Sequence, residues 1–162
     1  MNTRLMIRKL HNVMADTYAL YLKTQNYHWN VTGPQFASLH LLFEKQYQEL
    51  ALAIDLLAEH LRTFQERAPG TFEELNALKS IQDGDKHADG DEMLQHLAHD
   101  QHVMLSTLEK AFAAAKAADD ELTMHLLADR MAVHKKNAWM LESIMVVPTV
   151  QQTIIRHRKR PA

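Results

Sequence analysis

Histidine and carboxylate side chains share one face of the segment from Gln35 to Arg67, which contains neither glycine nor proline. The members of this polar stripe are His40, Glu44, Gln48, Ala51, Asp55 and Glu59. They follow one another in steps of three and four residues, which places them on the same face of an α-helix. Imidazole and carboxylate groups are ligands for iron, zinc or manganese. The pattern therefore predicts a metal site, although the same residues would also suit the solvated face of a surface helix.

The helix that carries this stripe is amphipathic. Its second, apolar stripe also advances by three and four residues and consists of Phe36, Leu39, Phe43, Tyr47, Leu50, Ile54, Leu57, Leu61 and Phe64. We predict one continuous helix from Gln35 to Arg67, closed by Ala68, Pro69 and Gly70.

One chain should not complete a metal site on this helix. Asp55 and Glu59 are one turn apart and can share an ion, but His40 precedes Asp55 by fifteen residues. At ~1.5 Å per residue they lie roughly 22 Å apart along a straight helix. A second copy, antiparallel and related by a two-fold axis near Gln48, would bring His40 of one chain beside Asp55 and Glu59 of the other. We therefore expect a metal site shared between subunits.

Composition favours one all-helical domain. The chain has 162 residues, of which 46% are hydrophobic, with only four glycines and four prolines. Cysteine is absent, which excludes disulfides and thiolate metal sites. We see no secretory signal and no apolar run long enough to cross a membrane, so we expect a cytoplasmic protein without membrane contacts.

Four long helices are predicted, at about residues 3–30, 35–67, 91–118 and 121–146. Thr71 and Glu74 form the pattern of a capping box for a short extra helix that reaches Lys79. We expect Leu5, Leu122 and Trp139 to point into the core. Two short connections and one long crossover between the second and third helices predict an all-α, ferritin-like four-helix bundle over residues 1–147.

One sequence run identifies a family resemblance. It begins at Asn26-Tyr27-His28-Trp29-Asn30, continues through Val31-Thr32-Gly33-Pro34-Gln35-Phe36, and is followed by Leu39-His40, Phe43-Glu44, Asp55 and Ala58-Glu59. This pattern resembles the Dps family, the mini-ferritins or DNA-binding proteins from starved cells. The similarity spans the bundle and is densest from Tyr27 to Arg62.

The resemblance implies a shell of twelve subunits that oxidises Fe(II), generally with hydrogen peroxide, stores Fe(III) and protects DNA from oxidative stress. It implies a ferroxidase whose catalytic ligands are His28, His40, Asp55 and Glu59, placed between two-fold-related subunits, with Glu44 as an auxiliary ligand. Trp29 resembles the aromatic residue beside the family's site.

The chain departs from the family at several positions. His60 stands where an arginine is common, and Thr63-Phe64-Gln65 lacks the usual glycines. In the region of the family's acidic threefold pores, Glu121 matches, while His125 replaces an acid and Asp120 and Asp129 lie nearby. The histidines of the third helix (His96, His99 and His102) are interpreted as an exposed polar face.

The C-terminal segment is basic. Arg156, Arg158, Lys159 and Arg160 leave the rest of the chain net acidic, since the whole carries −2. We assign residues 148–162 to a flexible tail. Such an end can be a solvated tail, or it can bind DNA non-specifically because weak phosphate contacts add up over many copies, which would make the protein nucleoid-associated.

Two rival functions differ from a mini-ferritin. A conventional ferritin builds its di-iron site inside one bundle with Glu-x-x-His motifs, and no such motif occurs in this sequence. The second rival is a non-enzymatic helical protein that binds and compacts DNA, with the polar stripe serving only as an interface.

Overall fold

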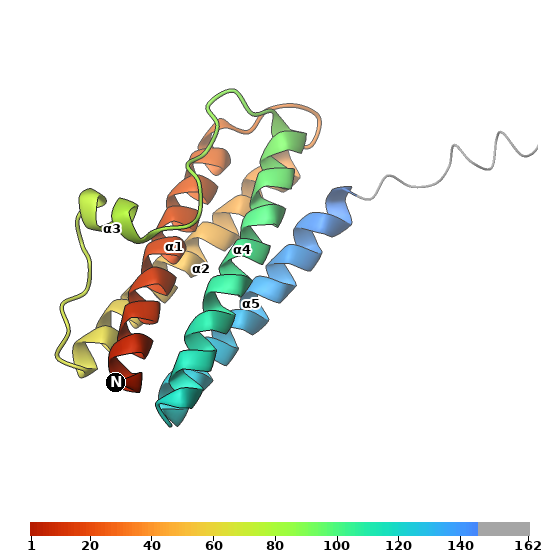
Figure 1. Ribbon diagram of the computed structural model, residues 1–162. Coiled ribbons are helices and arrows are strands. Elements are labelled where there is room, and N and C mark those ends of the chain that lie inside the picture. Colours follow the sequence, from red (N-terminus) through yellow and green to blue (C-terminus); the bar gives the residue numbers. More distant parts are fainter. Residues whose placement is uncertain (146–162) are drawn as a thin grey trace, which may run out of the picture.

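The computed structural model describes residues 1–145; the expected tail at 148–162, with its four basic residues, lies outside this part. Four long helices form an elongated bundle: α1 (Asn2–Asn30), α2 (Phe36–Thr63), α4 (Gly90–Ala117) and α5 (Glu121–Met145) (Figure 1). A short helix, α3 (Phe72–Leu78), lies in the connection between α2 and α4. The described residues contain no strand, so the predicted all-α fold with one extra helix is confirmed.

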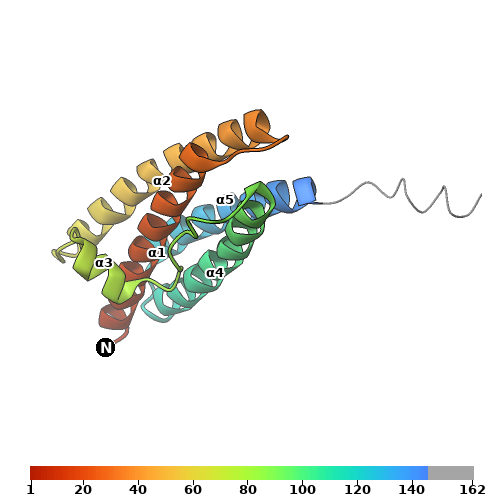
Figure 2. The same cartoon turned by 90° about the horizontal axis from the view of Figure 1, so that it is seen from above.

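The long helices pack in the order α2, α1, α4 and α5. Helix α1 packs against both α2 and α4, and α4 packs against α5, as the view from above also shows (Figure 2). The core between them contains Tyr27, Phe43 and Leu97, each fully buried. No helix in residues 1–145 is both long and apolar enough to cross a membrane.

Side chains cap the N-terminal ends of α3, α4 and α5. The predicted capping box at Thr71 and Glu74 is present, and a second one, formed by Asp89 and Glu92, starts α4 one residue earlier than expected. Asp120 accepts a hydrogen bond from the Thr123 backbone N–H at 2.9 Å and caps α5.

Helix α2 ends at Thr63, so the prediction that it continues to Arg67 was wrong. Gln65 adopts the left-handed conformation with φ of 63°, which turns the chain away from the helix axis. The carboxylate of Glu74 then accepts hydrogen bonds from the Gly70 and Thr71 backbone N–H groups, which holds this segment against α3. The end was missed because glycine usually occupies such a position.

Three inward predictions were also wrong. Leu5, Leu122 and Trp139 are 38%, 78% and 64% exposed. All three lie on long helices, but other residues of those helices form the buried face. Helical spacing alone did not show where that face ends.

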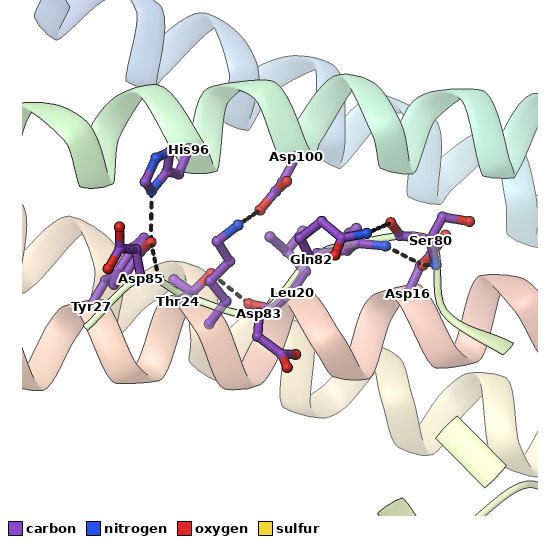
Figure 3. Close-up of polar contacts among 12 residues, drawn as sticks. Asp16, Leu20, Thr24, Tyr27, Ser80, Gln82, Asp83, Asp85, His96 and Asp100 are labelled. Carbon is purple, nitrogen blue, oxygen red and sulfur yellow. Dashed lines mark hydrogen bonds and ion pairs between the residues drawn. The ribbon is translucent and has the colours of Figure 1, made fainter. Parts of the chain in front are cut away.

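The long crossover is fastened to α1 and α4 by buried polar groups (Figure 3). Asp16 accepts hydrogen bonds from the backbone N–H groups of Ser80 and Ile81 and from the Thr107 hydroxyl. Farther along the same seam, Lys23 pairs with Asp100 at 2.7 Å. These contacts fix the register of α1 against α4. They thereby also fix the position of the C-terminal end of α1.

Candidate metal centre

His28 and His40 meet where α1 ends and α2 begins. The extended residue Val31 and Gly33, with φ of 100°, reverse the chain so that the two helices run antiparallel. The imidazole rings stack with centroids 3.9 Å apart and planes inclined by 21°. The structure therefore brings together two of the predicted ligands that are twelve residues apart in sequence.

Reciprocal hydrogen bonds orient the two rings. Nδ1 of His28 lies 2.8 Å from the carbonyl oxygen of His40, and Nδ1 of His40 lies 2.8 Å from the carbonyl oxygen of His28. A carbonyl oxygen can only accept, so each Nδ1 carries the proton and donates it. In a neutral ring Nε2 is then the lone-pair nitrogen, which is the arrangement expected of a metal-binding histidine held by a backbone carbonyl.

Asp55 and Glu59 lie on α2 with exposed side chains, away from this pair. The helix is unbroken from Phe36 to Thr63, so the separation of His40 and Asp55 is roughly 22 Å. Glu44, one turn beyond His40, is half-buried. Within residues 1–145, no three side chains of metal-ligand type converge on one point. Within one chain, the two histidines therefore lie near the start of α2, whereas Asp55 and Glu59 lie toward its end. We call these the imidazole half and the carboxylate half of the candidate site.

Aromatic rings pack around the imidazoles. Phe36 stacks on His40 with centroids 5.1 Å apart, and Tyr47 meets His28 edge to face at 5.2 Å. Phe36, expected in the core, is 46% exposed, and its ring stacks on His40 at the start of α2. Trp29 is 62% exposed.

Apolar side chains flank the polar stripe on the outer face of α2. Leu41, Leu52 and Leu56 are 64%, 75% and 49% exposed. Leu52 follows Leu41 by three turns, and Leu56 follows Leu52 by one turn, so they line the same side of the helix. A row of exposed leucines beside ligand-type side chains is typical of an interaction surface.

Comparisons with known proteins agree with this fold. The model of the ferritin-like domain matches residues 7–147. The DNA protection during starvation protein 2 of Bacillus anthracis is 34% identical over 139 residues, which span 86% of this chain and 95% of that protein. The chain belongs to the Dps family.

Solved Dps structures share the fold. The crystal structure of a Dps protein from Bacillus brevis superposes with a TM-score of 0.87 at 32% identity and covers 90% of this chain and 97% of that one. The Dps protein from Vibrio cholerae O1, described as a member of a broad superfamily of ferritin-like diiron-carboxylate proteins, gives a TM-score of 0.85 at 29% identity. It covers 90% of this chain and 91% of its own.

The three histidines of α4 do not form a cluster in this Dps chain. His96 lies half-buried with Nδ1 2.8 Å from the Tyr27 hydroxyl, His99 is exposed, and His102 pairs with Glu142 at 2.6 Å. The interpretation as an exposed polar face thus fits His99 and His102 but not His96, which belongs to the seam between α1 and α4.

The residues considered for a pore are exposed near the start of α5: Glu121, His125 and Asp129. His60, which departs from the family, lies 2.8 Å from the Thr123 hydroxyl through Nε2. Burial lowers the pKa of His60, and the charge of Asp120 partly opposes this shift.

A buried polar group inside the bundle, centred on His134, was not predicted from the sequence. His134 is fully buried, with Nδ1 2.7 Å from Oε1 of Gln101, and it lies one turn from Arg130, which forms a bidentate pair with Glu49. Burial, and then the Arg130 charge, lower the pKa of His134 to about 3. The only available signal was the i,i+4 spacing of Arg130 and His134, which is common on solvated faces.

Proposed function

We propose that this Dps chain is a ferroxidase that oxidises Fe(II) with hydrogen peroxide and stores the Fe(III) product. Each site would take His28 and His40 from one subunit and Asp55 and Glu59 from a two-fold-related subunit, with Glu44 as an auxiliary ligand. Iron is the substrate of this reaction. The observation that carries the proposal is the pair of reciprocal hydrogen bonds that leaves Nε2 of both histidines free to bind a metal.

The partner is required by the length of α2. If an antiparallel copy is centred near Gln48, His40 and Leu41 of one chain lie at the height of Leu56 and Asp55 of the other. The same operation that joins imidazoles to carboxylates would then also bury exposed leucines against each other, with two equal sites per dimer. The dodecameric shell that the family resemblance implies would contain this dimer as its unit.

In this proposal the four ligand residues position the iron ions and offset their positive charge. The imidazoles are neutral donors that hold Fe(II), and the carboxylates favour the more highly charged Fe(III). Two Fe(II) ions give one electron each to hydrogen peroxide, which takes up two protons and forms two waters. Because both electrons arrive at one place, the peroxide bond breaks without releasing a hydroxyl radical. This reaction would account for protection of DNA from oxidative damage.

Mixing defective subunits tests the shared site directly. A His40→Ala chain and an Asp55→Asn/Glu59→Gln chain should each be inactive alone. Co-assembled at equal amounts, half of the dimers are mixed and hold one intact site, so roughly a quarter of the wild-type sites should return. The measurement is formation of ferric product after addition of peroxide under anaerobic conditions.

The matched control mixes His40→Ala with His28→Ala chains. Both defects then lie on the imidazole half, and no mixed dimer contains an intact site, so activity should stay absent. Equal recovery in both mixtures, or no recovery in either, would contradict a site built from two chains.

The rival function, non-enzymatic DNA compaction, makes a different prediction. It expects no iron-dependent consumption of peroxide and no effect of His40→Ala. DNA binding can also accompany ferroxidase activity, and we propose that it uses the basic residues Arg156, Arg158, Lys159 and Arg160. Deleting residues 156–162 should abolish a gel shift of duplex DNA, and a shift that survives the deletion would exclude the tail.

A further inference from the structure

Three tyrosine rings continue from the histidine pair across the contact between α2 and α1. Tyr47 meets His28 at 5.2 Å, Tyr21 meets Tyr47 at 6.1 Å, and Tyr18 meets Tyr21 at 5.8 Å, measured between ring centroids. All three contacts are edge to face, which is a stable packing geometry for aromatic rings. The result is an unbroken path of rings from His40 to Tyr18.

The path has a direction. It begins at the imidazoles of the candidate centre and ends at Tyr18, which lines a cavity of about 360 Å³ between α1 and α3. Each of the three tyrosines is half-buried, so water can reach the row without separating the rings. The fourth tyrosine of the chain, Tyr27, points elsewhere: it is fully buried, and its hydroxyl contacts His96 and accepts the Asp85 backbone N–H.

A phenol is a one-electron donor, and a ferroxidase meets a situation in which one is needed. Hydrogen peroxide takes two electrons, whereas a site that holds a single Fe(II) can give only one. The missing electron must come from another group beside the iron, or the reduction stops at a hydroxyl radical. Among the tyrosines, Tyr47 is the one whose ring contacts a candidate ligand.

We infer that Tyr47, Tyr21 and Tyr18 form a one-electron relay that completes the reduction of peroxide at singly occupied sites; this inference rests on the proposed ferroxidase function. One Fe(II), one tyrosine hydroxyl, one hydrogen peroxide and one proton give one Fe(III), one neutral tyrosyl radical and two waters. The oxygen–oxygen bond breaks, iron and the phenol are each oxidised by one electron, and the phenol proton ends in water.

The radical then moves along the row. Tyr21 gives one electron and one proton to the Tyr47 radical, which restores the Tyr47 phenol, and Tyr18 does the same for Tyr21. The oxidising equivalent thereby leaves the iron ligands and ends on Tyr18, at the cavity beside α3, so His28 and His40 are spared from oxidation in that event.

Freeze-quench electron paramagnetic resonance tests the relay. The assembled protein is loaded with Fe(II) below the number of sites and mixed with hydrogen peroxide, while a spin trap in parallel samples reports hydroxyl radical. The wild type should show a tyrosyl signal that narrows when tyrosine is supplied with a deuterated ring. Tyr47→Phe keeps the ring packing and should lose most of this signal, with a matching rise in trapped hydroxyl radical.

Variants farther along the row separate initiation from transfer. Tyr18→Phe should keep the initial signal and shorten its lifetime, and Tyr18→Phe/Tyr21→Phe/Tyr47→Phe should abolish the signal although Tyr27 remains. Tyr27→Phe is the matched control and should keep the tyrosyl signal.

The outcomes distinguish this inference from the function on which it rests. Normal iron oxidation with no tyrosyl signal in the wild type would overturn the relay alone. So would a signal that persists in the triple variant, or one assigned to tryptophan, since Trp29 adjoins His28 in sequence. Absence of any peroxide-dependent iron oxidation in the wild type would overturn both proposals.

Discussion

Helix α1 contacts α4 on one side and α2 on another, and polar side chains lie in both contacts. The hydrogen-bond partners of these side chains differ between the two contacts. Against α4, Lys23 pairs with Asp100, Tyr27 contacts His96, and Asp16 binds the crossover (Figure 3). Against α2, the hydrogen bonds of the His28 and His40 rings go to backbone carbonyls through Nδ1, which leaves Nε2 of each free for another partner. Tyr27 and His28 are neighbours in sequence, yet Tyr27 is part of the α1–α4 contact whereas His28 belongs to the candidate metal centre.

The comparison shows that residue type alone does not indicate function. The seam with α4 contains the same acids and imidazoles that a metal site uses, but each group there has a partner within the chain, so the seam stabilises the fold. The pair against α2 is held rigidly by its Nδ1 atoms and is incomplete at Nε2, and the carboxylates Asp55 and Glu59 are exposed. A rigidly oriented imidazole with an unused lone pair on Nε2 is typical of a metal-binding site.

The largest expected difference concerns iron oxidation. His40→Ala should lower the peroxide-dependent rate by more than ~100-fold, because losing a direct ligand should cost at least as much as losing a supporting group. His96→Ala removes a comparable imidazole from the other seam and should leave the rate within about twofold of wild type. Stopped-flow measurement of ferric product compares the two variants. Equal losses would show that the seams are not functionally distinct.

The reverse difference is expected for folding. Lys23→Met leaves Asp100 buried without its partner and should lower the free energy of unfolding by ~3–5 kcal/mol. Burial already raises the pKa of Asp100 against the opposing effect of Lys23, so proton uptake should make the loss smaller at low pH. Urea unfolding at fixed protein concentration measures the change. Lys45→Met, an exposed substitution on α2, is the control.

A double variant sharpens this result. Lys23→Met/Asp100→Leu replaces the buried ion pair with apolar groups, so most of the stability should return, because no charge then remains buried. If the double variant is as unstable as Lys23→Met, the Asp100 carboxylate is not the source of the loss.

The fold and the imidazole half of the site followed from sequence for different reasons. Helical spacing predicted α1, α2, α4 and α5, and the capping box predicted α3, because these features depend on residues close in sequence. Without the family motif, His28 was one histidine among eleven. Its stacking on His40 depends on how the 31–35 link reverses the chain, which local patterns do not reveal.

The buried partners could not be predicted for a related reason. Lys23 with Asp100 and His134 with Gln101 join residues that are far apart in sequence, on helices whose relative register is set by the whole bundle. Lysine and aspartate usually lie at the surface, and histidine is intermediate in burial, so residue type does not indicate these buried positions.

Acid should unfold this protein partly through His134, a satisfied imidazole like His96. Burial lowers its pKa to about 3 in the folded chain, from an ordinary histidine value of 6.5. The unfolded state therefore binds the proton more readily, and the stability present above pH 6.5 is lost as pH falls toward 3. At pH 5 the loss is about 2 kcal/mol from this group alone. His134→Gln should reduce the slope of unfolding free energy between pH 6.5 and 5 in urea titrations; an unchanged slope would contradict the assignment.

The smallest effect tests whether the proposed site contributes anything to folding. Asp55 and Glu59 are like charges one turn apart on an exposed helix face, an arrangement that destabilises a helix by ~0.2–0.5 kcal/mol. Asp55→Asn should therefore raise the stability of the metal-free protein by about this amount, whereas removing a seam partner such as Lys23 lowers it. Calorimetry with a chelator present measures the first change. Repeating the scan with Zn²⁺ should reverse the order, because only the wild type keeps the full ligand set and gains stability by binding. A variant that is less stable than wild type without metal would mean that Asp55 has a structural partner, and the contrast between the two sides of α1 would no longer hold.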